Sequence, residues 1–191
     1  MTALDHPQRA REVRARFTAD EFMELARHEP IAGWTGKVEL VDGEIVRMAP
    51  ANIPHWVVQR SIVLQLQSIF ADLGTDWVVG HEPTVRLAPR IVRIPDVAVL
   101  HRPDLAAEGI FPREALFLAV EVADSSLKID LGRKRRDYAR AAVPHYWVAD
   151  LGARRVLLVS DPANGAYRIE REVGFGQPLP VPGTHATITV E

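Results

Sequence analysis

Two carboxylates stand inside apolar segments of the sequence, where charged side chains are unexpected. Asp96 lies within residues 94–100, and Glu121 lies within residues 118–122. A charged carboxylate in a sheet core is costly unless an opposite charge or a metal ion compensates it. If the two strands pair, the carboxylates converge and could hold a hard cation such as Mg²⁺, which takes oxygen ligands. The alternative is that each lies at a strand end, in water or paired with one of the many arginines.

A lysine follows these acids in a chain that uses arginine almost everywhere. Only Lys37, Lys128 and Lys134 are lysines among the 23 basic residues. Lys134 falls on the same stripe of a predicted helix as Tyr138, by the i, i+4 rule. A compact ammonium beside metal-bound carboxylates could orient a water nucleophile or stabilise charge on a phosphorane-like transition state. The alternative is a lysine whose stem covers the core while its head stays in water.

Glu39 is a third candidate acid. It lies in the middle of a predicted strand at 38–41, between Val38 and Leu40. Strand alternation alone also fits an ordinary outward-facing side chain at this position. Both interpretations of Glu39 remain open from the sequence.

The apolar residues of the chain recur with the period of a strand in some segments and with that of a helix in others. These segments are the elements that must position the candidate residues. Asp42-Gly43 separates strands at 38–41 and 44–48 and predicts a hairpin, because both residue types accept positive φ. Apolar spacing of three and four predicts helices at 18–28, at 55–73 and from Asp130, as a cap, to about 142. Further strands are predicted at 77–80, 84–87, 93–100, 116–122, 146–150, 154–160, 167–173 and 187–190.

Composition narrows the class of protein. With 191 residues, 47% hydrophobic and 25% charged, the chain is typical of a soluble globular protein. The absence of cysteine excludes disulfides, thiolate metal sites and cysteine nucleophiles. No stretch has the length of a signal peptide or membrane span, so we expect a cytoplasmic protein without membrane association. No glycine-rich phosphate motif occurs. We expect a loose leader at 1–16 and a single domain at 17–191.

The resemblance to a known family is carried by three blocks in the expected order. They are Val38–Met48 followed by His55, Arg93–Val99 with its Pro95-Asp96 pair, and Glu121–Asp150. Together they resemble the Uma-two family of bacterial proteins, described as endonucleases of the PD-(D/E)XK superfamily, across roughly residues 17–190. The resemblance implies an α/β (α+β) restriction-endonuclease-like core. A mixed central sheet would be flanked by helices, with an N-terminal hairpin and additional C-terminal strands.

The resemblance also implies roles for particular residues. Asp96 and Glu121 would be the ligands of Mg²⁺, with Mn²⁺ as a substitute. Lys134 would be the catalytic lysine, and Glu39 an additional acid at the same site. Tyr138 is expected to pack the helix against the sheet.

The sequence departs from the superfamily pattern at one point. The usual lysine stands two residues after the strand glutamate, where this chain has Ala123. The family supplies its lysine from the following helix, which matches Lys134 and leaves Lys128 as the alternative donor. His55 and Asp130 would support the site from its edge, and a helix-start role is the alternative for each.

Three hypotheses about function follow. The first is a Mg²⁺-dependent endonuclease acting on DNA, as a homodimer by analogy with enzymes that cut two strands. Since the net charge is −2, DNA binding would need a local basic patch. The alternatives are a catalytically silent nuclease-fold module that binds nucleic acid or protein, and a hydrolase of another phosphoester. The patch residues are Arg133, Arg135, Arg136 and Arg140, which could also form a solvated helix face.

Overall fold

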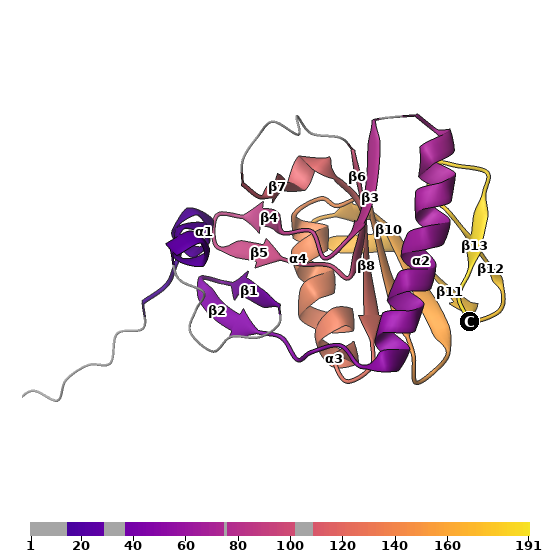
Figure 1. The fold of residues 1–191 in the computed structure, drawn as a ribbon, viewed down its shortest axis with the longest axis horizontal. Coiled ribbons are helices and arrows are strands. Elements are labelled where there is room, and N and C mark those ends of the chain that lie inside the picture. The colour runs from indigo at the N-terminus through magenta and orange to yellow at the C-terminus, as the bar shows by residue number, and fades with distance from the viewer. Residues whose placement is uncertain (1–14, 29–36, 75, 102–108) are drawn as a thin grey trace, which may run out of the picture.

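The computed structural model describes residues 15–28, 37–74, 76–101 and 109–191 (Figure 1). It has a mixed α/β architecture in which a six-stranded sheet forms the centre, in the order β11-β10-β9-β8-β6-β3. Strands β8 and β9 pair in parallel, whereas the other neighbours are antiparallel, so the sheet is mixed as expected. Its strands are β3 (Trp77–His81), β6 (Val97–His101), β8 (Leu116–Ala123), β9 (His145–Asp150), β10 (Arg155–Ala163) and β11 (Ala166–Gly174).

A second sheet has five strands in the order β2-β1-β5-β4-β7. Its strands are β1 (Val38–Val41), β2 (Glu44–Arg47), β4 (Val85–Ala88), β5 (Ile91–Arg93) and β7 (Phe111–Pro112). Near the C-terminus, β12 (Pro178–Pro180) and β13 (Thr187–Thr189) form a separate antiparallel pair. The predicted N-terminal hairpin and additional C-terminal strands are therefore present.

The hairpin turn follows from its two residues. Asp42 and Gly43 have φ values of 52° and 82°, the positive pair that a type I′ turn needs. A Cβ atom on Gly43 would lie 2.9 Å from the Cβ of Arg16, so the turn also needs glycine for space. Arg16 is one of the two residues of the predicted leader that the structure describes, and it donates to the Asp42 carbonyl at 3.1 Å.

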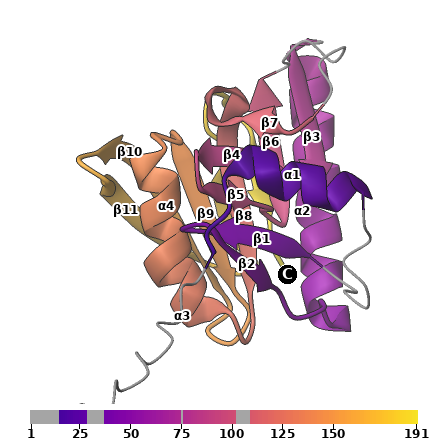
Figure 2. The ribbon, with the colours of Figure 1, turned by 90° about the vertical axis from the view of Figure 1, so that its left-hand side faces the viewer.

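Helices cover both faces of the central sheet. Helix α2 (Ile53–Asp72) packs on one face through a core that includes Ile62 and Leu66. Helix α4 (Arg135–Arg140) packs on the other through Tyr138. Figure 2 shows the two helices on opposite sides, with α1 (Ala19–His28) across the front. No helix within the described ranges is long and apolar enough to cross a membrane.

The predicted helix from Asp130 to 142 begins earlier than expected. It starts as α3 (Leu127–Ile129), continues as a π-helical segment (Asp130–Lys134) and ends as α4. The expectation that Asp130 caps the helix was therefore wrong, since Asp130 lies inside it and Ser126 precedes the first turn. The wide π-helical turn, a feature common at functional sites, holds both Asp130 and Lys134 in buried positions.

The predicted strand at 93–100 is two strands that belong to different sheets. β5 ends at Arg93 and β6 begins at Val97. Pro95 stands between them, and proline cannot donate a ladder hydrogen bond. Asp96 is thus placed immediately before a central strand rather than inside one, at the crossing between the two sheets. A short 3₁₀ turn (Arg113–Ala115) leads into β8.

Candidate functional site

Asp96 and Glu121 are brought together by the pairing of β6 with β8. The ladder sets Val97 opposite Val120, so one step further along, Asp96 lies beside the Glu121 end of β8. The backbone N–H of Val122 donates to Asp96 Oδ2 at 2.7 Å and fixes this junction. The pairing thus sets Asp96 beside Glu121, and both side chains line one pocket.

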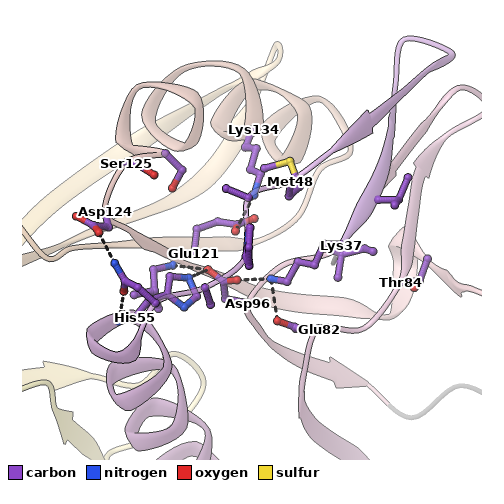
Figure 3. A pocket seen from close by; sticks show the side chains of 18 of the residues that line it. Lys37, Met48, His55, Glu82, Thr84, Asp96, Glu121, Asp124, Ser125 and Lys134 are labelled. Atoms are coloured by element: carbon purple, nitrogen blue, oxygen red, sulfur yellow. Dashed lines mark hydrogen bonds and ion pairs between the residues drawn. The ribbon is translucent and has the colours of Figure 1, made fainter. Parts of the chain in front are cut away.

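Asp96 is held from three directions. His55 Nε2, in the first turn of α2, lies 3.0 Å from Asp96 Oδ2. Lys37 contacts the other oxygen, Oδ1, and also lies 3.2 Å from a carboxylate oxygen of Glu82. Gln59 donates to the Asp96 carbonyl at 2.8 Å. Figure 3 shows His55 and Lys37 approaching the carboxylate from opposite sides.

Glu121 is 1% exposed and faces the helix that follows its strand. Lys134 Nζ donates to Glu121 Oε2 at 2.8 Å, and the hydroxyl of Tyr138 donates to Oε1 at 3.0 Å. Tyr138 packs in the core as expected, but it also orients this carboxylate. Lys134 is itself 4% exposed, so it does not reach into water.

Lys134 is surrounded by acids. Besides Glu121, its Nζ lies 3.4 Å from Asp130 Oδ1 and 3.9 Å from Glu39 Oε1. Asp130 also accepts from the Ser126 hydroxyl at 2.5 Å. The structure therefore brings all four residues implied as catalytic, and also Asp130, into one buried cluster.

Glu39 points inward and not outward. Its Oε2 accepts a hydrogen bond from Arg93 Nη1 at 2.6 Å, and its Oε1 accepts one from the Ile94 N–H at 3.0 Å. Arg93 is 2% exposed and its guanidinium also binds Asp137. The buried arginine thus joins the second sheet to the helix below the site.

Burial and neighbouring charged groups shift the pKa values of the two central carboxylates in opposite directions. Burial acts to raise the pKa of Asp96, but the His55 hydrogen bond and the Lys37 charge outweigh it and hold this pKa well below its ordinary value. Burial raises the pKa of Glu121 to about 8. The charges of Asp96, Asp130 and Glu39 add to that rise, whereas Lys134 opposes it.

The pocket above these groups has a volume of about 630 Å³. Asp96, Glu121 and Lys134 line it together with His55 and Lys37. Within the described residues, the cluster holds five buried carboxylates (Glu39, Asp96, Glu121, Asp130 and Asp137) against three cations (Lys37, Arg93 and Lys134). If every carboxylate is ionised, the formal excess is two negative charges.

This donor set fits a divalent cation that keeps most of its water. No group of three or more His, Asp or Glu side chains forms a ready metal cluster in the part of the chain that the structure describes. Mg²⁺ needs no such cage, because it is usually bound by one or two carboxylates and several waters. Asp96 and Glu121 are two carboxylates lining one pocket.

The other predicted residues are distributed differently. Lys128 is exposed and is not among the residues that line the pocket. Of the four patch arginines, Arg133 pairs with Asp42 and Arg135 with Glu170. Arg136 and Arg140 are exposed. None of these four described arginines lines the pocket.

Sequence reasoning missed Lys37 and Arg93 as parts of the site. Lys37 was counted as one of three lysines, but it precedes the first strand and belongs to no periodic pattern. Arg93 could have been found, because it adjoins the Pro95-Asp96 pair and lies in an apolar strand. A buried arginine needs carboxylate partners, and Glu39 is one.

Comparison with solved structures gives a match over most of the chain. The crystal structure of "a putative nuclease belonging to DUF820" from Anabaena variabilis is similar with a TM-score of 0.65. The match covers 90% of this chain and 94% of that chain, at 17% sequence identity. At this identity the likeness concerns the fold. A comparison with curated proteins found no match.

Comparison with protein families covers nearly all of the described site. The profile that matches, over residues 19–191, is that of Uma2, described as "Putative restriction endonuclease". The matched residues include the hairpin, the crossing at Asp96, strand β8 and the helix that carries Lys134. The chain therefore belongs to the Uma2 family of putative restriction endonucleases.

Proposed function

We propose that this protein is a Mg²⁺-dependent endonuclease that hydrolyses phosphodiester bonds of DNA on a restriction-endonuclease-like core. The observation that carries the proposal is the convergence of Asp96, Glu121 and Lys134 on one pocket. Two carboxylates from adjoining strands and a lysine from the next helix are the groups that metal-assisted phosphoryl hydrolysis requires. The family to which the chain belongs supports the same reaction class.

Each side chain has a defined task in this proposal. Asp96 and Glu121 would hold Mg²⁺, which when bound would activate a water molecule and neutralise the scissile phosphate. His55 holds Asp96 Oδ2 and Tyr138 holds Glu121 Oε1, so both carboxylates are oriented before substrate arrives. Lys134 supplies a fixed positive charge that could stabilise the charge developing on the phosphate.

A second candidate function is a silent module that keeps the fold without the chemistry. One observation favours it: both carboxylates already have ammonium partners, Lys37 for Asp96 and Lys134 for Glu121. In such a module the lysines would replace the metal permanently. Metal binding separates the two candidates, since only the endonuclease needs it.

The test is cleavage of plasmid DNA and of a labelled single-stranded oligonucleotide with Mg²⁺ or Mn²⁺. We expect Asp96→Asn and Lys134→Met each to lower the rate about 100-fold or more, as removal of one transition-state group does. Lys128→Met is the matched control, because it removes an exposed lysine outside the pocket, and it should cleave like the wild type. Activity that survives both site variants would overturn the proposal.

A further inference from the structure

The groups of the site lie deep in the protein. Asp96, Glu121 and Lys134 are 5%, 1% and 4% exposed, and all three line the pocket. A scissile phosphate must enter the pocket to reach them. A flexible single strand can bend its backbone into such a recess more easily than a stiff duplex can.

The pocket lining combines two kinds of side chain. The carboxylates and lysines described above form its ionic part. Apolar side chains from α1, β1, the end of β2, the crossing and β8 also line the pocket, namely Phe22, Met23, Val38, Met48, Ile94 and Val122. A site with an ionic region beside an apolar surface matches a nucleotide, which has an anionic phosphate and a flat base.

Two methionines among the apolar residues of the pocket could contact a base of any type. Met23 and Met48 are both partly exposed, and Figure 3 shows Met48 near Lys134 and above Glu121. A methionine thioether is polarisable and adapts its shape to an aromatic ring. Contact with the face of a base does not distinguish one base from another, because bases differ at their edges. The methionines therefore predict a weak sequence preference.

Hydroxyl groups at the pocket remain available for hydrogen bonds. Thr84 and Ser125 line it, and neither side chain has a hydrogen-bond partner within the described part of the chain. Such groups could contact a sugar or a base edge. The pocket volume of about 630 Å³ falls in the range of small-molecule sites, which is sufficient for one nucleotide.

Two exposed arginines of the predicted basic patch do not suit a duplex lying across this pocket. Lys134 and Tyr138 face the site from the helix, whereas Arg136 and Arg140 are exposed. By the helical period these two arginines point away from the site. A duplex tracked by those arginines would lie on another face of the molecule.

We propose that the pocket receives one unpaired nucleotide, with its phosphate toward Asp96 and Glu121 and its base against Met23 and Met48. The substrate class is therefore single-stranded or locally unpaired DNA. This inference rests on the proposed function and narrows it. The inference predicts that the protein prefers unpaired to paired DNA. It also predicts that this preference depends on the apolar residues of the pocket.

The first experiment compares the wild-type protein with Asp96→Asn on one labelled oligothymidylate, either alone or annealed to its complement. With Mn²⁺ we expect cleavage of the single strand to be at least tenfold faster than cleavage of the blunt duplex. Equal cleavage of both would overturn the inference but leave the proposed function standing. Absence of Asp96-dependent cleavage on either substrate would instead overturn the proposed function.

The second experiment measures binding without turnover, by fluorescence anisotropy of the same single strand in Ca²⁺. The double variant Met23→Ala/Met48→Ala should bind about tenfold more weakly, because it removes apolar contact area from the base. Leu64→Ala is the control, since it removes an exposed apolar side chain on α2 outside the pocket, and it should bind unchanged. Mn²⁺ affinity, measured by calorimetry, should be equal in all three proteins. Unchanged DNA affinity in the folded double variant would contradict the inference.

Discussion

At the scale of single residues, the site is two carboxylates in contrasting electrostatic settings. Asp96 is stabilised as an anion by Lys37 and His55, whereas Glu121 is buried deeper and has its pKa raised to about 8. Environments that separate the pKa values of neighbouring acids are typical of catalytic sites. The raised pKa means that Glu121 gives up its proton less readily than Asp96 does.

The first prediction concerns stability and pH in the presence of EDTA. The pKa of Glu121 rises from its ordinary value of 4.5 to about 8 on folding. Between these values the folded protein binds more protons than the unfolded chain, so the free energy of unfolding falls as pH rises. Glu121→Gln removes this titrating group and therefore its contribution to the pH dependence of stability. Urea unfolding between pH 5 and 8 should therefore show the wild type losing stability relative to the variant. Parallel curves would contradict the assignment.

The second prediction concerns Lys37. Its ammonium bridges Asp96 and Glu82, where it would compete with a divalent cation for the Asp96 carboxylate. Lys37→Met should tighten Mn²⁺ binding about tenfold in calorimetry, because a nearby like charge is removed. Lys128→Met should leave the affinity unchanged. Weaker binding by Lys37→Met would show that the lysine supports the site and does not compete for it.

The sequence revealed the acids better than it revealed their partners. Asp96 and Glu121 stand out because their neighbours along the chain are apolar, which is visible without a structure. Lys134 stands out as one of three lysines and by the helix stripe that it shares with Tyr138, and the family resemblance adds the catalytic role. The contacts of Lys37 and Arg93 depend on how the two sheets pack together. Local sequence patterns do not predict that packing.

At the scale of elements, short irregular segments position the site. The crossing at 94–96 turns Asp96 toward β8, and the π-helical segment turns Lys134 and Asp130 inward. The hairpin carries Glu39 to the same cluster. The Asp42-Gly43 turn signal predicted the hairpin, and apolar periodicity predicted the long helix α2. The apolar run continues across Pro95, so the prediction joined β5 and β6 into one strand. The predicted start of the third helix was late because an aspartate at position 130 resembles a helix cap.

The third prediction concerns the hairpin turn. Gly43→Ala places a Cβ where φ is 82° and where Arg16 Cβ would be 2.9 Å away. We expect a loss of about 1–3 kcal/mol in the free energy of unfolding. Gly174→Ala is the matched control, because a Cβ there meets no atom within 4 Å. Equal urea midpoints for the two variants would contradict the strained-turn explanation.

At the scale of the whole molecule, the site lies where the central sheet, the second sheet and both covering helices meet. Asp96 and Glu121 come from the crossing and β8, Lys134 from the π-helical segment, His55 from α2 and Glu39 from β1. The strand and helix patterns and the family resemblance predicted a mixed α/β protein, but not this junction. Because so many elements end at the pocket, a cation bound there should stabilise the entire fold.

The fourth prediction follows from this junction. Mn²⁺ at about 100 times its Kd should raise the free energy of unfolding by about 2.7 kcal/mol, since it binds only the folded protein. Thermal unfolding of the wild type should shift upward, whereas that of Asp96→Asn should not. A shift of equal size in both proteins would place the cation elsewhere.

The most direct test of the account is a crystal structure of the wild-type protein soaked with Mn²⁺, examined by anomalous diffraction. We predict one anomalous peak in the pocket, within about 2.0–2.6 Å of carboxylate oxygens from both Asp96 and Glu121. The Lys37 ammonium should have moved away from Asp96. A pocket without a peak, with Lys37 still in contact with Asp96, would contradict the central claim that these two carboxylates form a metal site.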